Sequence, residues 1–493
     1  MKKLLVVTVV LALLVSCGGG GGGGGNPNVP SATFWAYNEV TEKSYQLSAE
    51  MLADNNLCEV WVEKGSGVSQ ATASAIANEY RNSIYPRITA AFSERINFDN
   101  GTSYPSTVEL AYYIVEEFTG KRNSKLTILL LDIQDGYKTE TDPYVAGYFD
   151  SKDFFTTSDV MQQIDPNLRS NERAMLYMDV YPALSLGMDE FYGTIAHEMQ
   201  HLMNFATSIL LFSNKMKSSP NMDLWINEGL SAAAEWVYSR QYSQFRINWF
   251  SKDPTQLIRQ GNNFFVWGNR SKTSPVNDYK GSEILDDYAT VYLFFQWLRL
   301  QPGNNDIYKK IIFSSKPDYE AVVDEMSGYS TWPLLLEGWM KANYYTSGYG
   351  SDSILNNEVK VNYWPTNATT VSLFPGEGVY SVANLFSVPS PDTNYNYLGL
   401  QSGGTTTTSG NFSGVLLTYN KNTNNKQGAV PGGRTTGVTA NIVASGRFSM
   451  PDSLRGPYAI SMGDMIRRRG RIERNFDFTA MDSSKLFKGA FVE

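Results

Sequence analysis

Short apolar runs in the first part of the chain predict β-strands. They are bounded by polar or turn-forming stretches, and they cover residues 58–63, 126–133, 145–149 and 174–180. Between the first two runs, residues 69–96 instead predict a helical region that is interrupted at Pro86. The first third of the chain therefore predicts a sheet with helical connections.

Longer segments further along the chain predict helices. Residues 191–205 contain no proline and follow Asp189 and Glu190, which favour the amino end of a helix through its dipole. An alanine-rich second helix, 225–236, is close enough in sequence to pack antiparallel to the first. Residues 288–300 and 332–344 continue the helical part. Strands first and helices after are typical of an α+β fold.

The amino-acid composition changes near residue 355, where Thr, Ser, Gly and Asn become frequent. Short alternating runs such as 414–419 and 438–443 predict a β-sandwich-like C-terminal domain. We therefore expect one domain over residues 33–350 and a second, β-rich domain over residues 355–493.

The amino end predicts export. Lys2 and Lys3 precede an apolar run, 4–15, that is too short to span a membrane. The run ends in Leu-Val-Ser-Cys, the lipobox of bacterial lipoproteins, so residues 1–16 are the expected signal peptide and Cys17 the expected lipidated residue. Residues 17–32 then form a glycine-rich tether. These features predict a protein held on the bacterial cell envelope, at the outer membrane or cell surface, by its lipid anchor.

Both histidines of the chain lie in one stretch, His197-Glu198-Met199-Gln200-His201. On a helix, this H-E-x-x-H pattern places two imidazoles on one face beside a carboxylate that can act on a metal-bound water. Two histidines placed at random would have this spacing, with Glu after the first, in roughly one chain in 5,000. The motif therefore predicts a zinc-dependent hydrolase.

A catalytic zinc ion needs a third protein ligand and an open position for water. No third histidine exists in the chain, and Asn204 and Thr207 occupy the places where metzincins have Gly and His. A carboxylate is therefore expected, with Glu228 as the best candidate and Asp223 as the alternative. Glu235 lies two turns beyond Glu228, where it is either a hydrogen-bond partner of a ligating imidazole or a solvated surface charge.

The segments 194–205 and 225–231 resemble those of the hyicolysin family. Members of this family are bacterial extracellular neutral metallopeptidases of the gluzincin group. Upstream pieces at 58–62, 126–133, 146–150 and 174–179 also fit, so the resemblance covers about residues 33–345. It implies a two-lobed gluzincin-like domain with the metal between a sheet lobe and a helical lobe.

Residue by residue, the resemblance implies zinc on His197, His201 and Glu228, with Glu198 as general base. Gluzincins also use a Tyr or His on a later helix to stabilise the oxyanion, and here only tyrosine is left. Tyr288 is the best-placed candidate and Tyr292 the second, although both also fit a helical core stripe. We expect aspartates 286 and 287 to cap that helix.

The resulting prediction is a zinc endopeptidase that cleaves extracellular proteins or peptides. The substrate is expected to lie along an exposed sheet edge, with 174–180 as the candidate edge strand. A hydrolase with the same metal geometry but a non-peptide substrate remains an alternative. A different class also remains open: a surface-anchored binding protein or adhesin with a structural or inactive zinc site. The intact Glu198 argues against it, because a structural site needs no base.

Composition narrows the possible partners. The net charge of −8 argues against a nucleic-acid partner, and the cluster Arg467–Arg471 is expected to be a solvated face. Apart from Cys17, the chain has one cysteine, Cys58, which is expected to be a buried, inert thiol.

Overall fold

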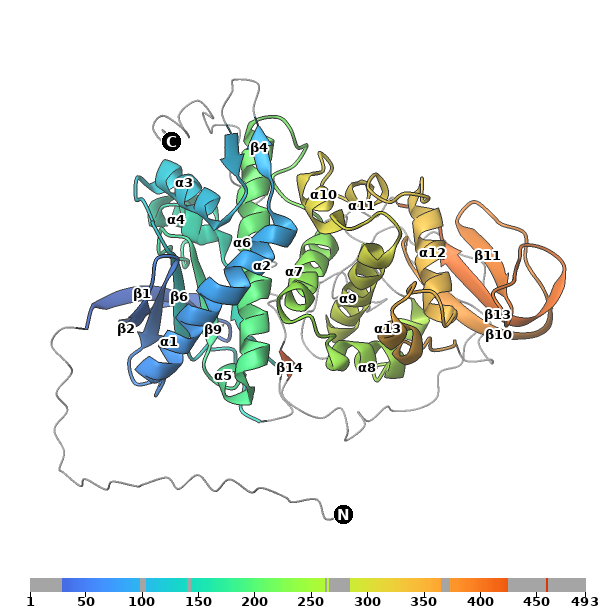
Figure 1. Cartoon of the computed structure of the whole chain (residues 1–493), viewed down its shortest axis with the longest axis horizontal. Helices are drawn as coiled ribbons and strands as arrows, with labels where there is room; N and C mark the ends of the chain where they lie inside the picture. Colours follow the sequence, from blue (N-terminus) through green and yellow to red (C-terminus); the bar gives the residue numbers. More distant parts are fainter. Residues whose placement is uncertain are drawn as a thin grey trace, which may run out of the picture.

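The computed structural model describes residues 29–97, 103–139, 143–261, 264–265, 284–364, 373, 375–423 and 458–459 (Figure 1). The predicted signal peptide, Cys17, all but the end of the tether, the run 438–443 and the arginine cluster 467–471 lie outside the described residues.

A six-stranded mixed sheet forms the amino-terminal part of the fold, in the order β1-β2-β3-β6-β9-β8. Its members are β1 (Ser31–Asn38), β2 (Lys43–Asp54), β3 (Cys58–Glu63), β6 (Leu126–Leu131), β9 (Met175–Asp179) and β8 (Gly147–Tyr148). The centre is parallel, because β3 pairs with β6 and β6 with β9, whereas β1, β2 and β8 add antiparallel strands. The predicted strands at 58–63, 126–133 and 174–180 are therefore confirmed, whereas only Gly147–Tyr148 of the predicted run 145–149 form a strand.

The predicted substrate edge is wrong. Strand β9, within 174–180, is an interior strand: it pairs with β6 on one side and with β8 on the other. All five of its residues are buried, which explains why the strand is apolar up to Asp179. The end of the sheet next to β9 is instead β8, only two residues long.

Both faces of the central strands are covered, and alternate residues contribute to different cores. Val60, Ile128 and Leu176 belong to the large core that continues into the helices. Trp61 and Leu129, which face the other way, join a smaller cluster with side chains from β1 and β2. This alternation follows from the two-residue repeat of a strand.

Helices cover one face of the sheet and continue into a separate helical region (Figure 1). The first helices and small strands are α1 (Gln70–Glu79), a π-helix (Tyr80–Ile84), α2 (Tyr85–Phe92), β4 (Arg95–Asn97), β5 (Ser103–Pro105), α3 (Val108–Thr119), β7 (Pro143–Tyr144), a 3₁₀ turn (Ser151–Phe154) and α4 (Thr157–Gln163). The predicted region 69–96 is thus helical up to Phe92, and its last residues form β4 instead. Pro86 falls in the first turn of α2, where a missing N–H costs nothing.

The second group of helices holds the motif segments. It comprises α5 (Ala183–Leu186), α6 (Met188–Ser213), α7 (Leu224–Ser239), α8 (Gln244–Lys252), a 3₁₀ turn (Ile258–Gln260), α9 (Ile284–Leu300), α10 (Ile307–Phe313), α11 (Glu320–Val323), α12 (Trp332–Tyr344) and α13 (Ser353–Glu358). Helix α7 packs against both α6 and α9 (Figure 1). The predicted aspartate cap of α9 is wrong, because Asp286 and Asp287 lie inside its first turn. Asp286 instead accepts hydrogen bonds from Trp249 and Thr255.

The described part of 355–493 beyond α13 contains a four-stranded antiparallel sheet in the order β10-β13-β11-β12. Its strands are β10 (Gly378–Ser387), β13 (Asn411–Asn420), β11 (Tyr395–Leu400) and β12 (Thr406–Thr407). Tyr380 donates a hydrogen bond to the carbonyl of Met340 (2.8 Å) and Tyr419 to the carboxylate of Glu337 (2.7 Å), so the sheet packs directly on α12.

The mixture of helices and strands confirms the α+β class. Among the described helices, none combines the length and apolar character needed to cross a membrane. Cys58 is buried on β3, as predicted, and burial raises the pKa of its thiol to about 12, which favours the unreactive thiol form.

Candidate metal centre

Helix α6 brings the H-E-x-x-H motif into the interior of the protein. His197 and His201 are one helical turn apart, with ring centroids separated by 4.8 Å. His197, Glu198 and His201 are all at most 4 % exposed. The apolar residues between and around them, including Ile195 and Met199, anchor the helix in the core, so the polar face has a fixed direction.

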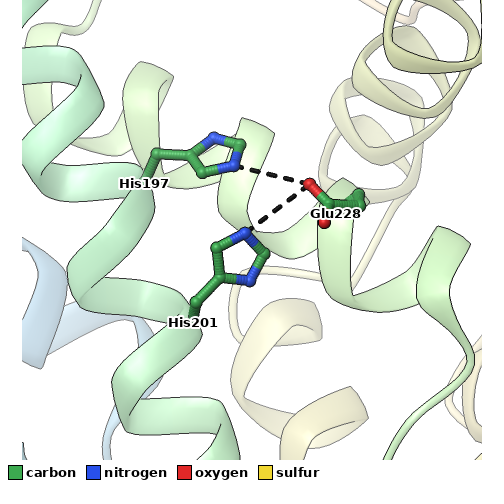
Figure 2. Close-up of side chains that lie close together, drawn as sticks. All are labelled: His197, His201 and Glu228. Atoms are coloured by element: carbon green, nitrogen blue, oxygen red, sulfur yellow. Dashed lines mark ion pairs between the residues drawn. The ribbon is translucent and has the colours of Figure 1, made fainter. Parts of the chain in front are cut away.

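Glu228 on α7 completes a three-residue group. Its Oε2 atom lies 3.5 Å from Nε2 of His197 and 3.5 Å from Nε2 of His201. One ligand atom from each residue lies within 4.8 Å of the other two. Figure 2 shows the two rings of α6 and the carboxylate of α7 pointing toward one another. The fallback residue Asp223 lies just before α7 and is not part of this group.

The opposite nitrogen of each ring is held by a different partner. Nδ1 of His197 lies 2.8 Å from Oε1 of Glu235. Nδ1 of His201 lies 3.1 Å from Oδ1 of Asn227 and 3.0 Å from Oγ of Ser231. Because the carboxylate and the amide oxygen are acceptors, each Nδ1 carries a proton, so in the neutral form of each ring Nε2 keeps its lone pair.

In the neutral rings these lone pairs face the carboxylate of Glu228, so the three groups together can coordinate a cation. Within the described part of the chain, the Nε2 atoms of His197 and His201 are buried and have no hydrogen-bond partner. Two lone pairs and one carboxylate that converge in this way cannot satisfy one another, whereas a metal ion satisfies all three. The residues present therefore fit a metal cofactor.

Electrostatics in the metal-free protein point the same way. Burial by itself lowers the pKa of His197, but the carboxylates of Glu228, 3.5 Å from Nε2, and Glu235, 2.8 Å from Nδ1, outweigh it and raise the pKa to about 10. Burial opposes the ionisation of Glu228, yet the two adjacent rings hold the pKa of its carboxyl well below the ordinary value. The site thus favours a positive charge next to an ionised Glu228, which a metal ion can supply instead of a proton.

Glu198 is tied to the edge of the sheet. Its Oε2 atom accepts a 2.9 Å hydrogen bond from the backbone N–H of Phe149, the residue that follows β8. Glu198 also lines a cavity of 460 Å³ together with Ala146 and Gly147. The edge strand, the carboxylate and His197 of the candidate metal group therefore line one cleft.

Two tyrosines of α9 line this cleft but point their hydroxyl groups differently. Tyr288 donates a 3.0 Å hydrogen bond to Oε2 of Glu228, so its hydroxyl lies at the metal group. The hydroxyl of Tyr292 instead accepts a 2.9 Å hydrogen bond from the backbone N–H of Ser243. The guanidinium of Arg246, on α8, lies over both rings, at 5.5 and 5.3 Å from their centroids.

Arg246 also fixes Glu235, because its Nη2 atom lies 2.5 Å from Oε1 of that carboxylate. The Glu235 side chain is 22 % exposed and contacts His197, so the structure favours its interpretation as a partner of the imidazole over a solvated charge. Sequence reasoning assigned no role to Arg246, Asn227 or Ser231. The signal for the last two was available: they lie one turn apart on the helix that carries Glu228. Arg246 left no such signal, because only the packing of α8 brings it to the site.

The fold and this site together define a candidate metallohydrolase centre: a buried His-His-Glu group beside a carboxylate at the wall of a cleft. No family model matches the sequence. The chain is similar to neutral metalloprotease ShpI of Staphylococcus hyicus, with 27 % identity over 286 residues, which is 57 % of this chain and 54 % of that protein. The chain thus matches about half the length of this relative. Together with the buried metal-binding group, the similarity supports a metallopeptidase family and a metal cofactor.

Proposed function

We propose that this protein is a zinc-dependent endopeptidase. The observation that carries the proposal is the convergence of two imidazole Nε2 atoms and the Glu228 carboxylate at the cleft where Glu198 stands. The similarity to a neutral metalloprotease supports a peptidase, and the cleft gives an extended peptide access to the site.

Zinc is the metal that this donor set favours. Two neutral imidazoles and one carboxylate form the three-ligand set typical of catalytic zinc, whereas calcium and magnesium prefer oxygen ligands alone. His197, His201 and Glu228 would hold the ion. Once bound, zinc would lower the pKa of a water molecule toward neutrality and polarise the scissile carbonyl.

Two residues of the chain then carry out the remaining steps: one transfers protons, and the other stabilises the negative charge of the oxyanion. Glu198 takes the proton from the attacking water and later gives it to the leaving amine. The Phe149 N–H bond orients Glu198 by holding its Oε2 atom, which leaves Oε1 for the proton. Tyr288 donates its hydroxyl hydrogen bond to the oxyanion as charge develops there.

A peptide substrate would lie along β8. This strand ends the sheet and lines the cleft through Gly147, so its backbone can pair with an extended peptide. The tie between Phe149 and Glu198 sets the distance from that peptide to the base. We therefore propose β8, and not the segment 174–180, as the strand that pairs with the substrate.

The finer features of the sequence prediction belong to the same proposal. We assign the sheet with α6 to one lobe of a gluzincin-like domain and the helices α7 to α9 to the other, and we assign the β10–β13 sheet to a β-sandwich-like C-terminal domain. The lipobox at Cys17 supports a lipid anchor on the bacterial cell envelope. The alternative, an adhesin with a structural or inactive zinc site, gains no support from a relative that is a metalloprotease.

The decisive experiment compares the wild type with Glu198→Gln for zinc content and casein cleavage. We expect about one zinc per chain in both proteins and cleavage by the wild type alone, with a loss of at least about 100-fold in kcat for the variant. A wild type that holds zinc but cleaves neither casein nor a broad peptide library would overturn the peptidase proposal and favour the binding protein.

A further inference from the structure

A short segment from near the carboxyl end of the chain lies beside the cleft. Strand β14 (Tyr458–Ala459) pairs in parallel with β7, placing Tyr458 opposite Pro143 and Ala459 opposite Tyr144. In Figure 1 the short arrow of β14 lies far from the β10–β13 sheet, near the lower end of α6. A segment remote in sequence from β7 therefore forms backbone pairing with it.

Strand β7 is the start of the run that forms the cleft wall. Tyr144, Ala146 and Gly147 all line the 460 Å³ cavity, and Phe149 then contacts Glu198. From Tyr144 to Gly147 the chain advances three residues, or roughly 10 Å in extended conformation. The pairing site of β14 and the proposed substrate edge are thus close in sequence along the same wall of the cleft, although β7 and β8 belong to different sheets.

An edge strand can pair with only one additional strand on its open side. A substrate peptide that extends past β8 along the cleft wall would reach Pro143 and Tyr144, whose backbone already pairs with β14. We infer that the Tyr458–Ala459 segment is a self-docked occupant of the cleft edge, which competes with extended substrates for the β7–β8 run. This inference rests on the proposed peptidase function and adds a level of regulation to that site.

The occupant has an advantage over free substrates because it belongs to the same chain. Its docking is intramolecular, so it does not depend on protein concentration and acts with a high effective concentration. A substrate must displace it. Release of the segment should therefore lower KM for long substrates and leave kcat unchanged, since β14 pairs with β7, whereas the metal group is supplied by α6 and α7.

A disulfide trap tests the docking in the full chain. Pro143→Cys combined with Tyr458→Cys places two thiols at directly paired positions, within reach of a disulfide. The matched control combines Pro143→Cys with Ser409→Cys, on the exposed turn before β13. The single variant Tyr458→Cys controls for pairing with the native cysteines, of which Cys58 is buried.

We expect the paired variant to cross-link under mild oxidation, with the control pair and the single variant remaining largely open. The oxidised form should show a KM for casein at least about threefold higher than the same protein after reduction, with kcat unchanged. No cross-link beyond that of the control pair overturns the docking. A complete cross-link that leaves KM unchanged overturns the competition.

A second readout separates this inference from the peptidase proposal. In a Glu198→Gln background, the binding of fluorescein-labelled casein can be followed by anisotropy without any turnover. Oxidation of the paired variant should weaken this binding by the same factor, and unchanged binding overturns the inference. If no form of the protein cleaves casein but oxidation still weakens binding, the catalytic proposal fails and the self-docked edge stands.

Discussion

The Oε1 atom of Glu235 lies 2.8 Å from Nδ1 of His197, and the same oxygen lies 2.5 Å from the guanidinium of Arg246. The carboxylate thus connects a candidate metal ligand on α6 to a cation on α8. A partner of this kind fixes the tautomer and orientation of a ligating imidazole and raises its basicity. Two residues outside the metal group therefore determine how well His197 can bind an ion.

Replacement of Glu235 by Gln should weaken metal binding without unfolding the protein. The amide keeps the size of the side chain but removes the charge that favours Nδ1–H, so we expect zinc affinity to fall about 10- to 100-fold. Competition with a chromophoric chelator measures the affinity directly. The matched control is Glu94→Gln, at an exposed position, for which zinc affinity should not change. Equal affinities for the two variants would mean that Glu235 does not support His197.

The two tyrosines of α9 form a natural test pair, because only Tyr288 points its hydroxyl at the metal group. Tyr288→Phe should lower kcat by about 100- to 1,000-fold with little change in KM, since the lost hydrogen bond acts on the oxyanion. Tyr292→Phe removes a hydrogen bond to the backbone of Ser243 and should cost less than about tenfold in kcat. Steady-state kinetics on one peptide substrate measure both. A larger loss for Tyr292→Phe would reverse the assignment.

Much of the metal group could be predicted from the sequence because its signals are local. His197 and His201 are four residues apart on one helix, and Glu228 opens the next helix. Helical periodicity alone fixes the face on which such residues lie. The absence of a third histidine then restricted the remaining ligand to a carboxylate.

The parts that the sequence did not predict depend on contacts between elements. The identity of the edge strand depends on which strand ends the sheet. Here that strand is β8, and only Gly147 and Tyr148 pair it with β9. The role of Glu235 depended on the distance between α6 and α7, which no periodicity sets. Arg246 reaches the site only because α8 packs on α9.

The pKa of His197 predicts how metal binding and stability vary with pH. Its pKa is about 10 in the folded, metal-free protein, above the ordinary 6.5, because the adjacent carboxylates of Glu228 and Glu235 outweigh burial. A raised pKa means that the protonated ring stabilises the fold fully below pH 6.5 and that this contribution is lost as the pH rises through about 10. The Tm of the metal-free protein should therefore fall between pH 7 and 10, relative to the zinc-bound protein.

The same proton must leave when zinc binds, since the metal takes the Nε2 lone pair. At pH 7.5, titration calorimetry in two buffers with different ionisation enthalpies should report the release of about one proton per zinc. Heats that do not depend on the buffer would show that His197 is already neutral in the metal-free protein.

Replacing each of two helical glycines by alanine should change the stability of the protein in opposite directions, because the space around them differs. At Gly229, beside Glu228 on α7, an added Cβ would lie 2.3 Å from the ring of Phe295 on α9. The ring is fully buried and has little room to move, so we expect Gly229→Ala to destabilise the fold by about 1–3 kcal/mol. At Gly193 on α6, an added Cβ meets nothing within 4 Å, so the higher helix propensity of alanine should stabilise the protein by up to about 1 kcal/mol. Urea denaturation of both zinc-bound variants measures the free energies of unfolding. A stabilising Gly229→Ala would mean that α7 and α9 do not approach as closely as the contact between Gly229 and Phe295 requires.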